Sequence, residues 1–294
     1  MEVRTYGWGE ADTPASLYAS ALPYLRASTR PSLRTFPTIA VSSQDEPAIS
    51  VENLTLAFGA FVVMRDLTFD IQQGEIFVIM GGSGSGKSTL LKHLIGLLYP
   101  SEGNIRVGGQ DLWAMDEAER SAMLREIGIL YQEDALWSTM TLAENVALPL
   151  EEHTSLADVD IERIVSLKLA LVGLRGFEDF RPHEISGGMQ KRAALARAIA
   201  LDPDMLFFDE PTSGLDPVSA RRLDDLILQL RDSLGTTIVV VTHDLESIFT
   251  IADRALYLDI ETKTMTALGA PEALRSNPPN KRVQQFLTRT LDEE

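Results

Sequence analysis

The sequence has no cysteine, and its 26 lysine and arginine residues stand against 43 aspartate and glutamate residues. Without cysteine there is no disulfide framework and no thiol chemistry, which fits a reducing compartment. The formal net charge of -17 argues against a sequence-independent hold on nucleic acid or anionic lipid, because both require clustered lysine and arginine. We therefore expect no nucleic-acid partner.

Long apolar runs are also missing. The most apolar stretches, "EIFVIMGG", "DMLFFDE" and "TTIVVVTHD", have the length of β-strands, whereas a transmembrane helix needs about 20 consecutive apolar residues. We therefore expect any membrane role to be peripheral. The 294 residues, 45% of them hydrophobic, suffice for one large globular domain or two closely packed ones.

The first part of the chain differs in composition from the rest. Residues 1–48 are rich in serine, threonine, alanine and proline and show no sustained period, so we expect a mostly irregular extension. Its basic middle resembles an organelle-targeting segment, but acids near its start favour a plain tail or an early start codon. A short tail is expected at 291–294.

From residue 49 the chain alternates between strand and helix patterns. A strand-rich entry with turn glycines precedes a buried strand at 76–80, and further buried strands are expected at 205–209 and 237–241. Each buried strand is followed by a helical pattern, and residues 113–200 are rich in helix. This order predicts an α/β fold with a parallel sheet and crossover helices.

A glycine loop follows the first buried strand. The stretch "GGSGSGKST" fits the pattern G-x-x-x-x-G-K-[ST] and lies between that strand and an apolar helix, which is the context that a phosphate-binding loop requires. Its backbone N–H groups would close around a triphosphate, Lys87 would reach the β and γ oxygens, and the Ser88 hydroxyl would ligate Mg²⁺. An accidental glycine-rich turn does not account for both flanks. The candidate nucleotide-binding residues are Gly81, Gly82, Ser83, Gly84, Ser85, Gly86, Lys87, Ser88 and Thr89.

Two carboxylates end the strand "MLFFDE". Ligands of open α/β sheets collect at this edge, so Asp209 is placed to hold Mg²⁺ and Glu210 to polarise the attacking water. An ordinary acidic strand end is the alternative, which the neighbouring "PTSGLDP" and the phosphate loop disfavour. His243 ends the next strand in the same way, and a place beside the γ-phosphate is favoured over a structural role.

Three further features are less specific by themselves. Gln132 follows a short apolar strand, and its amide could accept Mg²⁺ or order the water. Phe58 could offer its ring to a purine or belong to the core, and the sequence leaves both open. In "EISGGMQKRAALARAIA" a Ser-Gly-Gly opens an apolar helix, which makes an anion site from backbone amides although the chain already has a phosphate loop.

These motifs, in this order, resemble the nucleotide-binding subunit of an ABC transporter over about residues 49–290. The resemblance implies a P-loop NTPase with a RecA-like core sheet, an antiparallel β subdomain and an α-helical subdomain inserted at about 133–190. It also implies ATP and Mg²⁺ as ligands and a head-to-tail homodimer, in which the Ser-Gly-Gly of one subunit caps the γ-phosphate on the other. The motif roles that it implies are Phe58 for adenine stacking, Gln132 for the Q-loop, Ser186, Gly187 and Gly188 for the signature, Asp209 for Walker B, Asp216 for the D-loop and His243 for the switch. It implies Glu210 as the catalytic base, with Lys87, Gln132 and His243 also in the catalytic set. The residues that it implies around the metal are Ser88, Gln132 and Asp209.

Within this family the chain is most similar to the ATPases of Mla/Mce-type lipid transporters. The signature reads Ile185 and Met189 where many relatives have leucine and glutamine, and Gly82 replaces a frequent proline. The "SGGM" signature and the ending "GAPEALRSNPPNKRVQQFL" carry the closer resemblance. It implies phospholipid or another hydrophobic cargo, a permease dimer, an MCE-type substrate-binding protein, a small STAS-type accessory subunit and a place on the cytoplasmic face of the inner membrane.

Two alternatives remain open at this point. An importer of amino acids or osmolytes would share every nucleotide-contacting residue, because partners select the cargo. A soluble ABC protein acting on ribosomes or DNA damage is disfavoured by the single nucleotide domain, the acidity and the absence of zinc or coiled-coil insertions.

Overall fold

The computed structural model describes residues 46–132 and 135–290. The expected tail at 291–294, and all but the last three residues of the expected extension at 1–48, lie outside these ranges. The chain forms two compact units, one containing Leu136–Asp202 and the other containing the remaining described residues.

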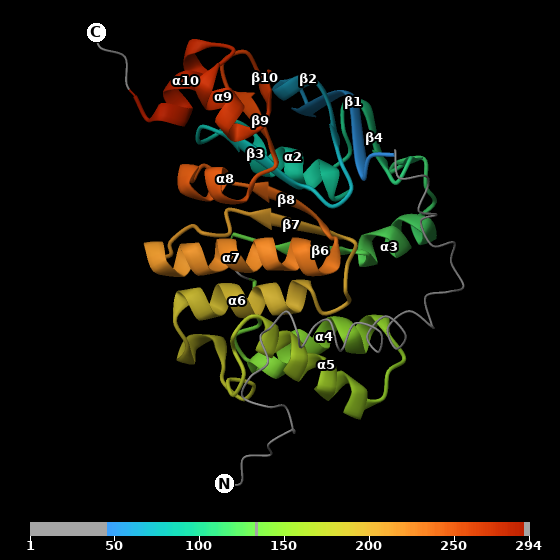
Figure 1. Ribbon diagram of the computed structural model, residues 1–294. Helices are drawn as coiled ribbons and strands as arrows, with labels where there is room; N and C mark the ends of the chain where they lie inside the picture. Colours follow the sequence, from blue (N-terminus) through green and yellow to red (C-terminus); the bar gives the residue numbers. More distant parts are fainter. Residues whose placement is uncertain (1–45, 133–134, 291–294) are drawn as a thin grey trace. The chain divides into compact units, whose positions relative to one another are not determined.

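The larger unit is built on a six-stranded sheet with the strand order β10-β9-β3-β8-β7-β6 (Figure 1). β3 pairs in parallel with β8 and β9, and β7 pairs in parallel with β8 and β6. Only β10 runs antiparallel to its neighbour within this sheet as described. Every residue of β3, β7 and β8 is buried, as expected when both faces of a parallel sheet are covered. The predicted parallel sheet is therefore confirmed, with one antiparallel strand, β10, added at its edge. The strands of the sheet are β3 Ile76–Gly81, β6 Ile127–Leu130, β7 Met205–Asp209, β8 Thr237–Val241, β9 Arg254–Asp259 and β10 Thr264–Gly269.

A second sheet in the same unit is antiparallel, with the order β2-β1-β4-β5. Its strands are β1 Ile49–Phe58, β2 Phe61–Ile71, β4 Glu102–Val107 and β5 Gln110–Asp111. β1 and β2 form a hairpin whose turn contains Gly59 in the left-handed region at φ 60°, so Phe58 and Phe61 stand opposite each other. Buried residues of this sheet, of α2 (Lys87–Leu94) and of the main sheet form one hydrophobic core.

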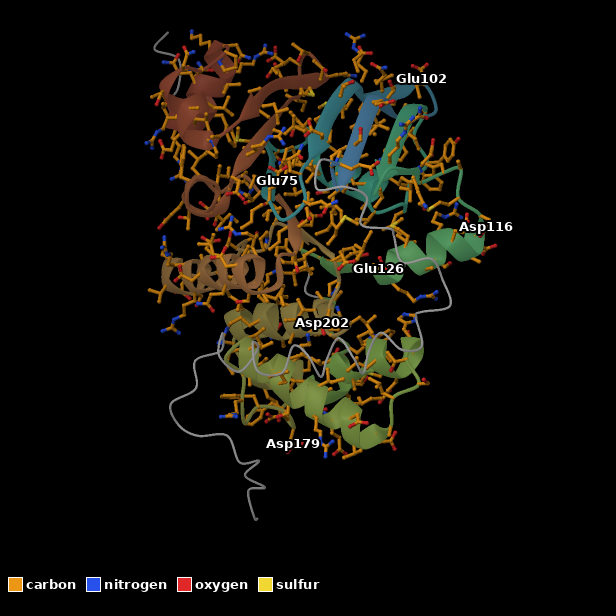
Figure 2. All side chains as sticks on the ribbon, turned by 45° about the vertical axis from the view of Figure 1, so that its right-hand side comes forward. Glu75, Glu102, Asp116, Glu126, Asp179 and Asp202 are labelled. Carbon is orange, nitrogen blue, oxygen red and sulfur yellow. The ribbon has the colours of Figure 1, made fainter. Side chains whose placement is uncertain are left out.

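The remaining helices of the larger unit begin at well-defined caps. Asp116 lies at the start of α3 (Glu117–Arg125), as Figure 2 shows. It accepts a hydrogen bond from the Glu119 N–H, and its own N–H donates to the Glu119 carboxylate. α7 (Pro217–Leu234) begins with proline after the cap Asp216. The others are α8 Leu245–Ile251, α9 Pro271–Ser276 and α10 Lys281–Thr288. Within the described ranges, no helix is long and apolar enough to cross a membrane.

The smaller unit, Leu136–Asp202, is helical. Its elements are α4 Leu142–His153, α5 Asp158–Leu171, the 3-10 turn η1 Pro182–Glu184 and α6 Gly187–Ala198. The fully buried Lys168 of α5 pairs with Asp202 at 2.5 Å, which places a compensated charge inside the unit. The helical insertion expected at about 133–190 falls mostly within this unit.

Candidate active site

The glycine loop connects β3 to α2, as the sequence predicts. Gly86 precedes α2 in the left-handed region, at φ 83°, and a Cβ there would lie 2.8 Å from a Val63 methyl carbon. A Cβ on Gly81 would lie 2.6 Å from the Leu258 carbonyl oxygen. Side chains at these two positions would therefore clash with the hairpin or with β9, so the loop shape depends on glycine. The first turn of α2 directs its free N–H groups toward the loop, which makes an anion site.

Lys87 lies across this loop. Its ammonium donates to the carbonyl oxygens of Gly81 at 3.0 Å and Gly82 at 3.1 Å. Burial lowers the pKa of the Lys87 ammonium, while the nearby carboxylates of Glu210 and Asp209 oppose that shift. The cation thus lies between the phosphate loop and the acidic end of β7.

Asp209 and Ser88 meet at the same point. The Ser88 hydroxyl donates to Asp209 Oδ1 at 3.0 Å. Burial raises the pKa of Asp209, and the hydrogen bond from Ser88 opposes this effect. The hydroxyl and carboxylate are hard oxygen donors of the kind that Mg²⁺ prefers, and Gln132 lines the same cleft. These residues therefore fit a magnesium ion held together with phosphate oxygens.

Glu210 is held in a strained backbone conformation one residue further on. It is not a glycine, yet its φ is 51°, and its N–H donates to the Val241 carbonyl at 2.8 Å. Its Oε1 lies 2.8 Å from His243 Nδ1, and its Oε2 accepts from the Thr242 hydroxyl at 3.3 Å. The Glu210 carboxylate is mostly buried, whereas the His243 side chain is 64% exposed. Two adjacent residues of the β8–α8 connection therefore hold one carboxylate.

These groups surround one cleft of about 890 Å³. Phe58 lines it and is 55% exposed, so the structure excludes the core alternative for this ring. The predicted residues at this cleft are Phe58, Gly82, Ser83, Gly84, Ser85, Gly86, Lys87, Ser88, Thr89, Gln132, Glu210 and His243, with Asp209 and Gly81 bonded to members of the set. The predicted motifs of the larger unit therefore meet at this one cleft.

The remaining predicted residues lie elsewhere. Ser186 caps α6, and its hydroxyl accepts from the Met189 N–H at 3.3 Å, while Gly187 and Gly188 form the first turn. Among the described residues, a Cβ on Gly187 would meet nothing within 4 Å, so this helix start is not covered by them. It belongs to the smaller unit. Asp216 caps α7 by accepting from two backbone N–H groups and does not line the cleft as described.

Sequence reasoning missed several residues of the cleft. Phe61 lines it beside Phe58, and a signal was present, because both aromatic residues flank the turn glycine. The end of α10 also lines it through Gln285, Phe286, Arg289 and Thr290, which lie about 200 residues after the phosphate loop and match no motif. Thr242, which directly follows β8 and bonds Glu210 without lining the cleft, has no distinguishing pattern in the sequence.

A glycine loop between a buried parallel strand and a helix, facing an acidic strand end, defines a phosphate-loop nucleoside triphosphatase. A protein-family profile described as "ABC transporter" matches residues 64–213. The chain belongs to the ABC transporter family, and it is an ABC-type ATPase.

Relatives support this placement along most of the chain. The intermembrane phospholipid transport system ATP-binding protein MlaF of Haemophilus influenzae is 43% identical over 239 residues, which cover 81% of this chain and 89% of the relative. MlaF of Escherichia coli K12 is 40% identical over 244 residues, which cover 83% and 90%. A probable ribonucleotide transport ATP-binding protein, mkl, of Mycobacterium leprae is 46% identical over 206 residues, but only 59% of that relative is spanned.

Solved structures share the fold. The dimeric ATP-binding cassette MJ0796, in a post-hydrolysis state with ADP and Pi, aligns with a TM-score of 0.69 and 30% identity over 76% of this chain and 98% of that one. CbiO1 from Clostridium perfringens, part of the ABC transporter complex cbiONQ, aligns with a TM-score of 0.71 and 28% identity over 84% and 96%. The predicted fold class is confirmed.

Proposed function

We propose that this ATPase powers the movement of phospholipid, or of another hydrophobic molecule, across the bacterial envelope. The observation that carries the proposal is the likeness to two MlaF proteins over 89% and 90% of their lengths. A likeness of this extent includes segments that do not contact nucleotide.

The geometry of the cleft supports a division of roles. Glu210 is the general base, because its carboxylate faces the phosphate loop and is held from two sides. His243 senses the γ-phosphate beside it, and Lys87 exchanges its bonds to the loop carbonyls for bonds to the β and γ oxygens. Gln132 orders the water. Phe58 stacks on the adenine.

Ser88 and Asp209 are proposed to hold Mg²⁺, with Gln132 reaching it from the cleft wall. When bound, this ion neutralises charge on the triphosphate. The hydrogen bond between Ser88 and Asp209 already places their oxygens together, so the chain needs little rearrangement to provide both.

The open start of α6 supports a homodimer. Ser186, Gly187 and Gly188 would cap the γ-phosphate bound to the partner subunit, with Asp216 at the dimer contact, because a helix N-terminus with free amides favours an anion. One chain alone is then a poor ATPase. ATP binding closes the dimer, and hydrolysis opens it.

The remaining partners follow from the cargo. We propose a permease dimer, an MCE-type substrate-binding protein and a small STAS-type accessory subunit, with the ATPase on the cytoplasmic face of the inner membrane.

The test begins with the assembled complex. The chain is purified from its native membrane in mild detergent, and mass spectrometry identifies the proteins and lipids that accompany it. An MCE-domain protein with bound phospholipid is expected. The same complex in liposomes should then move labelled phospholipid only with ATP, and a Lys87→Ala complex should not. A polar solute-binding protein in place of the MCE protein would contradict the lipid assignment and leave the ATPase assignment intact.

The likeness to mkl favours one rival cargo, a ribonucleotide, since that name includes ribonucleotide transport. The alignment leaves 41% of that relative unmatched, so it carries less weight than the MlaF likeness. Uptake of labelled ribonucleotide by the same liposomes, with no movement of phospholipid, would decide for it.

A further inference from the structure

The connection between β8 and α8 holds the Glu210 carboxylate through two side chains. His243 Nδ1 lies 2.8 Å from Oε1, and the Thr242 hydroxyl donates to Oε2 at 3.3 Å. Thr242 is fully buried. The position of the proposed base therefore depends on the position of this short connection.

Asp244 fixes that connection to α8. Its N–H donates to the Thr242 hydroxyl oxygen at 3.0 Å, so it bonds the group that in turn holds Glu210. Its Oδ1 accepts from the Glu246 N–H at 3.1 Å and caps α8, and its Oδ2 lies 3.4 Å from the Ser247 hydroxyl. A group that orients Ser247 and Asp244 by hydrogen bonding therefore also orients the β8–α8 connection.

A buried carboxylate on α7 lies behind this cap. The Ser247 hydroxyl donates to Asp224 Oδ2 at 3.0 Å, and the two residues are 1% and 2% exposed. Asp224 Oδ1 is buried as well and makes no hydrogen bond within the described parts of the chain. Burying a carboxylate with one oxygen unpaired is costly, so its presence on a helix that could carry an apolar residue there calls for a role.

We propose that Asp224 is a positioning residue for ATP hydrolysis, which acts through Ser247 to fix the connection that holds Glu210. This inference rests on the proposed function, in which Glu210 is the base. Asp224 touches neither nucleotide nor the reacting atoms. It anchors the side of α8 that faces α7, and the hydrogen bonds of Asp244 and Thr242 transmit that anchorage.

The direction of the bond gives the role a pH dependence. Ser247 has one hydroxyl proton, which it donates to ionised Asp224. Protonated Asp224 would instead donate to Ser247, whose proton would then turn toward Asp244. Burial raises the pKa of Asp224 to about 6; Asp244 on the α8 cap and Asp225 on α7 act in the same direction, while the Ser247 hydrogen bond and Arg221 on α7 lower it. The chain of hydrogen bonds from Asp224 through Ser247 to Asp244 therefore reverses its direction as the pH passes through about 6.

The decisive experiment measures ATP hydrolysis by the assembled complex from pH 5.5 to 8.5. Asp224→Asn removes the charge, and Ser247→Ala removes the hydroxyl. We expect each to lower kcat about 5- to 50-fold with KM for ATP changed less than about two-fold, because displacing a base by a fraction of an ångström slows chemistry without altering ground-state binding. The matched control is Asp225→Asn, on the same helix but 48% exposed in its pair with Arg221, which should behave as the parent.

The pH profile separates positioning from simple support of the fold. The turnover of the parent should change in a step near pH 6, and the two test variants should lack that step. Asp225→Asn should keep the step, at a slightly lower pH, because it removes one of the charges that raise the pKa of Asp224. A parental kcat and a parental pH profile in Asp224→Asn would overturn the inference. If Asp224→Asn fails to fold, the same kcat and pH-profile measurements on Ser247→Ala test the inference, because that change removes only a hydroxyl group. Glu210→Gln is run in parallel: parental turnover there refutes the proposed base, whereas an inactive Glu210→Gln beside a normal Asp224→Asn refutes the positioning role alone.

Discussion

Replacing Asp224 by asparagine should remove a loss of stability that the protein suffers as the pH rises to neutral, even though the same change is expected to slow turnover. The carboxyl is 2% exposed, and burial raises its pKa to about 6 from the ordinary 3.8. The folded state therefore binds this proton more tightly than the unfolded state does. Stability falls as the pH rises from about 3.8 to about 6, and the loss is complete above that range.

The size of the effect follows from the two pKa values. At about 1.36 kcal/mol per pKa unit, the ionised carboxylate costs about 3 kcal/mol of unfolding free energy at pH 7.5 and roughly half of that at pH 5. Asparagine removes this cost but introduces a buried amide whose own penalty does not vary with pH. The gap between variant and parent should therefore widen by about 1.4 kcal/mol from pH 5 to pH 7.5, whatever the amide costs.

Urea unfolding of the full chain at the two pH values measures this gap, with Asp225→Asn as the exposed control. The control should follow the parent at both pH values, because its carboxylate is paired at the surface. Parallel pH dependences for Asp224→Asn and the parent would show that the Asp224 carboxyl is not a raised-pKa group, and the reasoning from its burial would be wrong.

Three further changes test the proposed site. Glu210→Gln should keep ATP binding, lower turnover by a factor on the order of 10² to 10⁴ and trap an ATP-bound dimer visible by light scattering; a monomer turning over at the parental rate would remove Glu210 from the base role. Lys87→Ala should lose ATP binding or turnover, at about 2–4 kcal/mol of transition-state stabilisation, in a nucleotide-binding and hydrolysis assay, and normal activity would discredit the phosphate-loop assignment. Ser186→Arg should abolish hydrolysis while the monomer still binds ATP at its own loop; loss of ATP binding by the monomer would contradict capping across a dimer.

Local patterns predicted the part of the site that depends on the chain near each motif. The phosphate loop, the carboxylates at the end of β7 and the histidine after β8 were found because a buried parallel strand brings its carboxyl end to a common edge. The glycine spacing of the loop and the length of the apolar runs were sufficient for that. The parallel sheet followed from the same runs.

Other parts depend on contacts between distant segments, which no local pattern reveals. In "RRLDDLILQL" the helical period does not say which of the two adjacent aspartates faces the core, yet Asp224 is buried and Asp225 is exposed. Ser247, the partner of Asp224, lies on the next helix, α8, and the strand β8 comes between the two helices in the chain. The place of α10 beside the cleft and the exposure of Phe58 likewise depend on tertiary packing.

The phosphate loop and the Ser186–Gly188 turn lie in different compact units of the chain. In the proposed dimer each catalytic centre takes its loop from one chain and its turn from the other. A chain with a defective phosphate loop and a chain with a defective Ser186–Gly188 turn should then restore ATPase activity to each other in a mixed dimer. A pair of one Lys87→Ala chain and one Ser186→Arg chain combines both lesions in a single centre and leaves the other centre whole, so two inactive proteins mixed together should regain part of the activity that neither has alone.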